Sequence, residues 1–232
     1  MFCLQETKIQ TMSEGVVRSL GTRRFLDWGA LDASGSLGGI LICWDKRTLD
    51  MLKLEVGHFS IFCRLRNVED GCVWMFTGVY GLFSREEREC LWEELGAIKG
   101  IWDDPLVFRG DFNVILSQRE RSRQGRLTGA MRRFALIVDE LGLVDLSLQG
   151  GLLTWNGGWN NQSWTKLDRF LVTQNWLDQF SGVFQSRLPR PTSDHFPILL
   201  EGGGLRRGPS PFRFENMWLK VEGFKDLLRG WW

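Results

Sequence analysis

The chain has 232 residues, 25% of which are charged, and its formal net charge at pH 7 is +1. This length suits one large mixed α/β domain, or one domain followed by a tail. The near-neutral charge excludes a global basic field as an argument for nucleic-acid binding, although charge can still be concentrated locally.

Five cysteines are spread along the chain without Cys-x-x-Cys spacing, and most lie in apolar runs. A thiol in such a run behaves as a small hydrophobic side chain, so we expect these cysteines to be buried and reduced. The start of the chain lacks the pattern of a signal peptide, and no apolar run approaches the roughly 20 residues that a membrane span needs. We therefore expect a soluble intracellular protein, nuclear or cytoplasmic, that does not act at a membrane.

Short apolar runs bounded by Gly, Asp or Asn predict strands. In chain order, these runs are LGGILICW, FSIFCRL, CVWMFTGVY, PLVFRGDFNVIL, GLLTW, SWTKLDRFLV and SDHFPILLE. Two amphipathic helices are predicted between them. The first follows a capping box of Ser84 and Glu87 and ends at Gly100, and the second begins near Thr128 and ends at Gly142.

The order of these elements predicts the fold class. Hairpin-like strand pairs in one stretch and alternating strands and helices in another favour layered sheets with helices outside, so we expect an α+β sandwich. After Glu201 the composition changes to GGGLRRGPSP, which is typical of a flexible, turn-rich linker. The predicted domain therefore covers residues 1–201, and residues 202–232 form a linker and a helix-like segment.

The stretch RGDFNVIL places two polar residues, Asp111 and Asn113, at the end of an apolar strand. Because side chains alternate along a strand, both would point to the same face while Phe112 packs on the other. A turn is the alternative interpretation, since Gly, Asp and Asn are all turn formers.

Of the two histidines, His195 has the more polar surroundings: it follows Asp194 at the start of an apolar strand, whereas His58 has no polar pattern around it. Asp168 lies in TKLDRFLV, within a strand that is otherwise largely apolar. A buried carboxylate there needs a partner. The neighbouring Arg169 points to the opposite face, so an imidazole such as His195 is a better candidate.

The chain uses 16 Phe and 12 Trp but a single Tyr, Tyr80. A hydroxyl is therefore plausible there as a hydrogen-bond donor in a cleft, although chance use of one Tyr is the alternative.

The polar residues singled out so far supply carboxylates, an imidazole and neutral donors. Together these groups suit metal-assisted phosphoester hydrolysis with Mg²⁺ rather than Zn²⁺. The candidate site residues are Glu6, Tyr80, Asp111, Asn113, Asp168, Asp194 and His195.

Five blocks in the order LQETK, VYG, GDFN, KLDRF and SDHFPI make the chain resemble the endonuclease/exonuclease/phosphatase superfamily. LQETK, the Trp-containing hairpin before KLDRFLV and the tail PFRFENMWL look most like the endonuclease region of plant LINE-type (non-LTR) retrotransposon proteins. The resemblance implies a DNase I-like, four-layered sandwich of two packed mixed β-sheets flanked by helices. It also implies a hydrolase that uses Mg²⁺, or alternatively Mn²⁺, to cut the phosphodiester backbone of DNA.

The resemblance also implies roles for the candidate residues. Glu6 would ligate the metal, with Asp194 helping at the metal edge, and Asp111 would orient or activate the attacking water. Tyr80 and Asn113 would hold phosphate oxygens.

For the SDHFPI block, the resemblance implies that His195 contacts the phosphate or assists proton transfer. Asp168 would fix the orientation of its ring.

One departure concerns the start of the chain. The family usually opens with an Asn-bearing strand upstream of the LQET block, and here only Met1 and Phe2 stand before Cys3. The resemblance therefore implies an N-terminally truncated domain whose first strand is missing, with an open sheet edge and weak or absent activity.

Three functions remain open at this point. The arginine-rich run RERSRQGRLTGAMRR, residues 119–133, favours a DNA endonuclease if it contacts phosphates, but it is equally explained as a solvated surface. A phosphatase acting on inositol or lipid phosphates would need a basic pocket for a small polyanion. A non-catalytic relic of a transposon, or a nucleic-acid-binding fragment, is the alternative from a different functional class.

Overall fold

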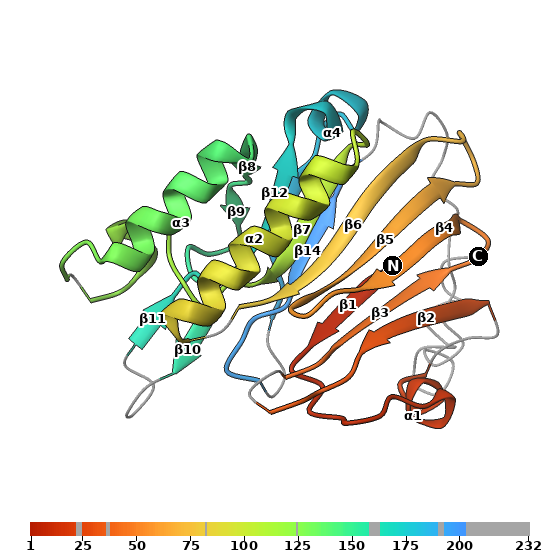
Figure 1. The fold of residues 1–232 in the computed structure, drawn as a ribbon, viewed down its shortest axis with the longest axis horizontal. Coiled ribbons are helices and arrows are strands. Elements are labelled where there is room, and N and C mark those ends of the chain that lie inside the picture. Colours follow the sequence, from red (N-terminus) through yellow and green to blue (C-terminus); the bar gives the residue numbers. More distant parts are fainter. Residues whose placement is uncertain are drawn as a thin grey trace, which may run out of the picture. The chain divides into compact units, whose positions relative to one another are not determined.

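Two layers of β-structure with helices outside them make up the fold in the computed structural model (Figure 1). The structure describes residues 1–21, 25–35, 38–81, 83–123, 125–157, 163–189 and 193–202. Apart from Gly202, the linker and helix-like segment predicted for residues 202–232 lie outside these residues. None of the described helices is long and apolar enough to span a membrane.

The larger sheet has six strands, and its mixed topology brings several strand ends to one edge. Neighbouring strands are antiparallel except β6 and β7, which run in parallel and are connected by helix α2. A parallel pair requires such a crossover, and it places the C-terminal ends of both strands at the same edge. In order across the sheet, the strands are β4 (Leu49–Val56), β5 (Ser60–Asn67), β6 (Val73–Tyr80), β7 (Leu106–Asp111), β12 (Asp168–Thr173) and β8 (Leu143–Asp145).

Helices α2 (Arg85–Ile101) and α3 (Gly129–Glu140) lie on one face of this sheet (Figure 1). The predicted Ser84 cap is present, since its side chain accepts from Glu87 N, and the structure also shows Thr128 as an N-cap whose side chain accepts from Met131 N. The buried faces meet in an aromatic cluster of Trp92, Phe112 and Phe134, with the Trp92 and Phe134 ring centroids 5.1 Å apart. Both predicted helices are confirmed, although α2 continues one residue past Gly100.

The other face of the six-stranded sheet is covered by two groups of three strands. The first group has the order β1 (Phe2–Gln5), β3 (Ile40–Asp45), β2 (Leu26–Leu31), and the second has the order β14 (Ile198–Glu201), β13 (Phe184–Arg187), β9 (Leu148–Gln149). Helix α1 (Glu14–Ser19) packs its Val17 outside the first group against Leu41 and Cys43. With α2 and α3 opposite, the arrangement is the predicted α+β sandwich of four layers.

The remaining short elements connect these layers. They are a 3₁₀ turn at Gln118–Glu120, the two-stranded ribbon of β10 (Trp155–Gly157) and β11 (Ser163–Thr165), and helix α4 (Gln174–Gln179). Among the described strands, β1 pairs only with β3.

Three strand predictions need correction. Within GLLTW only Trp155 belongs to a strand, because the preceding residues form a loop that places Thr154 beside Asp168. SWTKLDRFLV is divided into β11 and β12. The strand in PLVFRGDFNVIL ends at Asp111, because Asn113 adopts a left-handed conformation with φ of 48°, which a strand does not accommodate.

The expectation that the cysteines are buried holds for Cys43 and Cys63, whereas Cys90 is exposed.

A buried ion network lies on the face of β12 opposite the candidate site. Arg169 has no exposed surface, and its guanidinium contacts Glu120 at 3.0 Å and Asp145 at 2.9 Å. Lys166 Nζ also pairs with Asp145, at 2.8 Å. As predicted from strand alternation, Arg169 points away from the carboxylate of Asp168.

Candidate active site

Three polar residues stand side by side where strands of the larger sheet meet one edge. Tyr80 ends β6 and Asp111 ends β7, and the two are partners in the parallel register. Asp168 begins β12 and is the antiparallel partner of Asp111. The topology therefore places a phenol and two carboxylates next to one another, although 88 residues separate the first from the last in the sequence (168 minus 80).

His195 joins this edge from the loop before β14. Its Nδ1 lies 2.7 Å from Asp168 Oδ2, and its Nε2 lies 3.8 Å from Asp111 Oδ2. Asp168 is buried, and its own backbone N–H donates to Thr154 Oγ1 at 2.9 Å. The imidazole is thus the partner that the buried Asp168 requires, and its other nitrogen faces Asp111.

The electrostatics of this cluster favour a charged imidazole beside a carboxyl group that can exchange a proton near neutral pH. Burial lowers the pKa of His195, but the hydrogen bond and charge of Asp168, together with Asp111 and Asp194, outweigh it and raise the pKa to about 9. Burial, followed by repulsion from Asp168, raises the pKa of Asp111 to about 7. The backbone N–H of Asn113 and the charge of His195 partly oppose that rise.

Glu6 reaches the same edge from the end of β1. The chain leaves β1 at Gln5, and Glu6 then adopts a positive φ of 51°, which turns its side chain toward Tyr80. The Tyr80 hydroxyl donates to Glu6 Oε1 at 2.5 Å. Burial and this hydrogen bond raise the pKa of Tyr80, so the phenol stays protonated as a donor.

Gln5 anchors β1 to the ends of β6 and β7, and the sequence reasoning did not single it out. Its amide nitrogen donates to Val79 O, and its Oε1 accepts from the Asp111 backbone N–H at 3.1 Å and from the Arg109 guanidinium. The neighbouring Glu6 carries a carboxylate and is therefore a candidate metal ligand, whereas a glutamine at the end of a strand has no charge that would mark it as a site residue. Thr154 was missed for a similar reason, since a neutral hydroxyl in an apolar run is a common core feature.

Asn113 lies at the edge of the site rather than on a continuation of β7. Its backbone N–H donates to Asp111 Oδ1 at 2.9 Å, and its Nδ2 donates to Gly81 O at 2.6 Å. This is the turn interpretation left open by the sequence. In this turn, the backbone N–H of Asn113 orients the Asp111 carboxylate.

Asp194 is held on the side of the β10–β11 ribbon. Its Oδ2 accepts from the Trp155 indole Nε1 at 2.9 Å, and its backbone oxygen accepts from Asn156 N at 2.9 Å. Although burial opposes it, the Trp155 hydrogen bond contributes most to lowering the pKa of Asp194. Asp194 therefore stands next to His195 in the chain with one carboxylate oxygen already engaged by Trp155.

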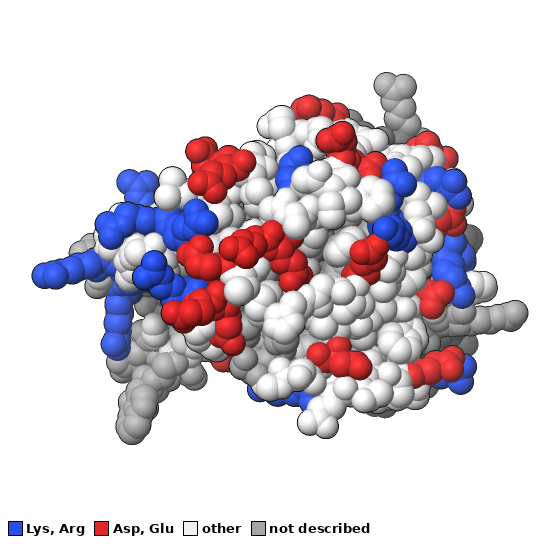
Figure 2. All heavy atoms as spheres, in the orientation of Figure 1, with Lys and Arg blue, Asp and Glu red and all other residues white. Residues whose placement is uncertain are grey.

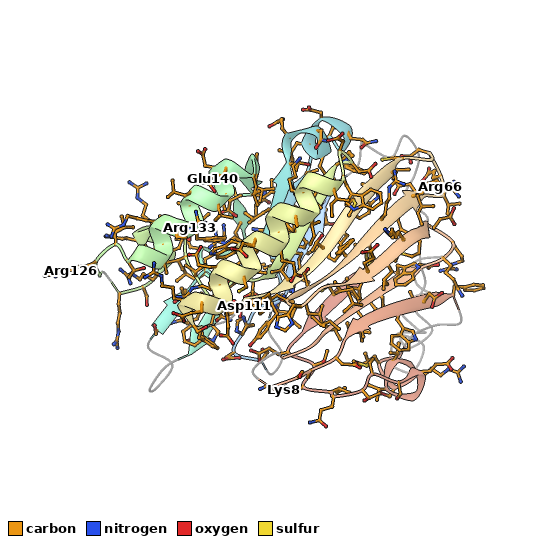
Figure 3. The ribbon with its side chains drawn as sticks, in the orientation of Figure 1. Lys8, Arg66, Asp111, Arg126, Arg133 and Glu140 are labelled. Carbon is orange, nitrogen blue, oxygen red and sulfur yellow. The ribbon has the colours of Figure 1, made fainter. Side chains whose placement is uncertain are left out.

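A cavity of about 430 Å³ opens beside the Glu6 carboxylate. Glu6, Lys8, Tyr80 and Phe83 are among the side chains that line it. Figure 3 shows Lys8 below Asp111 in the lower half of the view. A substrate can thus approach Glu6 and Tyr80 from solvent.

The oxygen-rich donor set suits a hard divalent cation better than zinc. Among the described ranges, no three His, Cys, Asp or Glu side chains form a cluster that would hold a metal on their own. Mg²⁺ usually keeps several waters and takes only one or two carboxylates, with substrate oxygens completing its shell. The Glu6 side chain is 41% exposed at the cavity and its charge acts on Asp111, so the residues present fit a partly hydrated Mg²⁺.

Removing the hydroxyl of Tyr80 tests whether it positions Glu6. In Tyr80→Phe, Glu6 loses a charge-assisted hydrogen bond, and we expect metal-assisted hydrolysis at this site to slow by about 10- to 100-fold. The Mg²⁺ concentration needed for half-maximal rate should rise as well, which a purely structural role would not produce. Rate measurements over a Mg²⁺ titration check this, and an unchanged titration midpoint would contradict a positioning role.

Comparisons with known proteins identify the family of the chain. A family model described as Endonuclease/Exonuclease/phosphatase family matches residues 1–195. A comparison with curated protein sequences finds no significant match.

Solved structures with a similar fold include both nucleases and a phosphatase. The endonuclease domain of TRAS1, a telomere-specific non-LTR retrotransposon, has a TM-score of 0.61 at 17% identity, covering 80% of this chain and 83% of that one. AP endonuclease LMAP from Leishmania major has a TM-score of 0.66 at 16% identity, with coverages of 84% and 76%. A mannosyl-6-phosphatase from Bacteroides thetaiotaomicron has a TM-score of 0.52 at 15% identity, with both coverages 77%. At these identities the likeness shows the fold.

Proposed function

The chain belongs to the endonuclease/exonuclease/phosphatase family, and we propose that it is a Mg²⁺-dependent DNA endonuclease of the retrotransposon type. The observation that carries the proposal is the meeting of Glu6, Asp111 and His195 at one edge of the sandwich. Asp111 and His195 come within 3.8 Å of each other, and Tyr80 connects Glu6 to the same edge.

Asp111 serves as the group that orients the attacking water and takes its proton. A general base works best when its pKa lies near the working pH, and burial raises the pKa of Asp111 to about 7. The backbone N–H of Asn113 fixes one carboxylate oxygen, which leaves the other facing His195.

His195 contacts a phosphate oxygen through Nε2 as a charged donor. Its Nδ1 is occupied by Asp168, which holds the ring in one orientation and favours its protonated form. A cation placed beside a phosphodiester stabilises the negative charge that develops as the water attacks. Asp168 is thus a positioning residue that acts through the imidazole.

Glu6 would hold Mg²⁺, or Mn²⁺ in its place, with Asp194 at the metal edge. The ion, when bound, polarises the phosphate and neutralises charge on its oxygens. Tyr80 orients Glu6 through its hydroxyl. Asn113 uses one amide N–H on Gly81 and has a second N–H available for a phosphate oxygen.

A concentration of arginine supports DNA as the substrate over a small phosphate ester. Figure 2 shows Lys and Arg side chains gathered at one end of the molecule, where Figure 3 labels Arg126 in the loop before α3. Arg119, Arg123, Arg126 and Arg132 are exposed there. Such a surface can contact successive phosphates of a nucleic acid.

The substrate class is tested with supercoiled plasmid. We expect the purified protein to nick it in Mg²⁺ or Mn²⁺, and we expect excess EDTA to abolish nicking because the proposed reaction needs the ion to polarise the phosphate. In parallel assays, phosphate release from inositol polyphosphates and mannose 6-phosphate should be negligible. Release of phosphate without nicking would instead identify a phosphatase.

The non-catalytic alternative predicts a different pattern. A nucleic-acid-binding fragment would bind DNA in a salt-dependent way and nick none, and its binding would persist in both Asp111→Ala and His195→Ala. The same plasmid assay, combined with binding measurements at two salt concentrations, separates this alternative from the proposed endonuclease.

A further inference from the structure

A pocket of about 270 Å³ lies between helices α2 and α3, outside the candidate active site. Its lining includes three arginines, Arg85 and Arg88 from α2 and Arg133 from α3. Glu89 is the one acidic residue among the described residues that line it, and the buried Trp92 lines it as well. Three guanidinium groups therefore face a single carboxylate in this pocket.

Contacts within the protein hold two of these guanidinium groups in place. Arg133 Nε lies 3.0 Å from Glu89 Oε2, and Arg88 Nη1 donates to the backbone oxygen of Phe83 at 2.6 Å. The exposed Arg85 side chain makes no hydrogen bond or ion pair with the described part of the chain. A guanidinium forms paired, charge-assisted hydrogen bonds with phosphate oxygens. The pocket is therefore complementary to a phosphate group in both charge and donor geometry.

The pocket is close to the candidate active site along the chain. Arg85 begins α2 five residues after Tyr80 (85 minus 80), so at most about 18 Å separates their Cα atoms. Asn113 of the site binds Gly81, the first residue of this connection, at 2.6 Å. Successive phosphates of one DNA strand advance about 3.4 Å along the helix axis, so about five nucleotides span this distance. A phosphate within about five positions of the cut can thus reach the pocket.

We propose that this pocket binds one phosphate group of the DNA substrate, at a position other than the phosphodiester that is cut; the inference rests on the proposed DNA substrate. Arg85 and Arg88 contact the same phosphate, with Arg133 beside them. The location supports DNA as the source of that phosphate. Arg126 and Arg133, both labelled in Figure 3, lie toward the end of the molecule where Figure 2 shows basic side chains gathered. A DNA backbone that follows this surface passes the pocket.

The salt dependence of DNA binding counts the phosphates that the protein neutralises, since log K changes with log[salt] by a slope of about 0.9 per contact. Binding of a fluorescent duplex is measured by anisotropy over a range of NaCl concentrations, in EDTA so that the proposed reaction does not proceed. Because two guanidinium groups share one phosphate, we expect Arg85→Gln and Arg88→Gln each to reduce the slope by up to about 0.9. The double variant should reduce it by no more than that. Arg85→Lys keeps the charge and should retain the wild-type slope.

Arg66→Gln is the matched control for losing one positive charge. Arg66 pairs with Asp50 at 2.8 Å, and Figure 3 labels it at the opposite end of the molecule from Arg126, so its variant should keep the wild-type slope. A second arm uses inorganic phosphate and compares it with NaCl at equal ionic strength. We expect phosphate to weaken DNA binding by the wild type more than NaCl does, and this excess should shrink in the double variant.

Three results would overturn the proposal. The first is a wild-type slope in both single variants. The second is a reduction of about 1.8 in the double variant, which would show two separate contacts instead of one shared phosphate. The third is loss of phosphate competition in the double variant without any change in its affinity for DNA, which would assign the pocket to free phosphate. Because binding is read without cutting, a chain that binds DNA through the pocket but nicks no plasmid would contradict the proposed endonuclease and leave this inference standing.

Discussion

His195→Ala is expected to slow plasmid nicking by about 10²- to 10³-fold, the typical cost of removing a positioned donor that stabilises charge developing in the transition state. The substitution removes the charged donor 3.8 Å from Asp111 and leaves the buried Asp168 carboxylate without its imidazole partner. The rate is measured as the initial loss of supercoiled plasmid at saturating Mg²⁺. Thermal unfolding of the variant separates loss of function from loss of fold.

The chain offers a matched control for this variant in its other histidine. His58 is exposed at the β4–β5 turn, so His58→Ala should nick plasmid at the wild-type rate. Equal loss in both variants, or wild-type nicking by His195→Ala, would contradict the assigned role of His195.

The pH dependence of the wild-type rate provides a second readout of the same site. Because the pKa of Asp111 is raised to about 7, its proton-accepting form is lost as pH falls through that value. We therefore expect kcat/KM to decline below about pH 7, while circular dichroism shows the fold intact. A rate independent of pH between 5 and 8 would argue against Asp111 as the base.

Arg169→Met is expected to lower the free energy of unfolding by about 3–5 kcal/mol, the typical cost of breaking a buried ion pair from one side. The guanidinium is fully buried between Glu120 and Asp145, and its bonds to Glu120 help lower the pKa of that carboxyl against the effect of burial. Methionine has a similar stem but cannot neutralise the two carboxylates. Lys166 then remains as their nearby cation. Urea unfolding measures the change.

An exposed ion pair serves as the control for this substitution. Arg66 pairs with Asp50 at 2.8 Å, but its side chain is 49% exposed, so Arg66→Met should cost less than about 1 kcal/mol. Similar losses in the two variants would show that burial does not decide the contribution of Arg169.

Local sequence patterns were sufficient for elements whose stability is set within a few residues. The capping box at Ser84 and the apolar faces of both segments predicted α2 and α3 because N-caps and helical periodicity act over three or four positions. Local sequence patterns were insufficient around Asp111. There, the apolar run suggested a longer strand, but the positive φ of Asn113 ends it, and its side chain donates to Gly81, the residue that follows β6.

Part of the site was predictable because the cost of burying a single charged side chain can be read from its neighbours in the sequence. The cost of burying an ionised Asp168 in an apolar strand pointed to His195, and the structure places the two groups 2.7 Å apart. Nothing local indicated that Gln5 would bind the ends of β6 and β7, because its partners, Val79, Arg109 and Asp111, lie more than 70 residues away.

By itself, the sequence determined the fold class, the two long helices and which polar residues would be expensive to bury without partners, since these depend on periodicity and on the solvation of single side chains. Only the tertiary structure decided that Tyr80, Asp111 and Asp168 stand in register and that Glu6 and His195 complete their edge. Those arrangements follow from strand order and register across the sheets, which are set by the packing of distant segments and not by any local pattern.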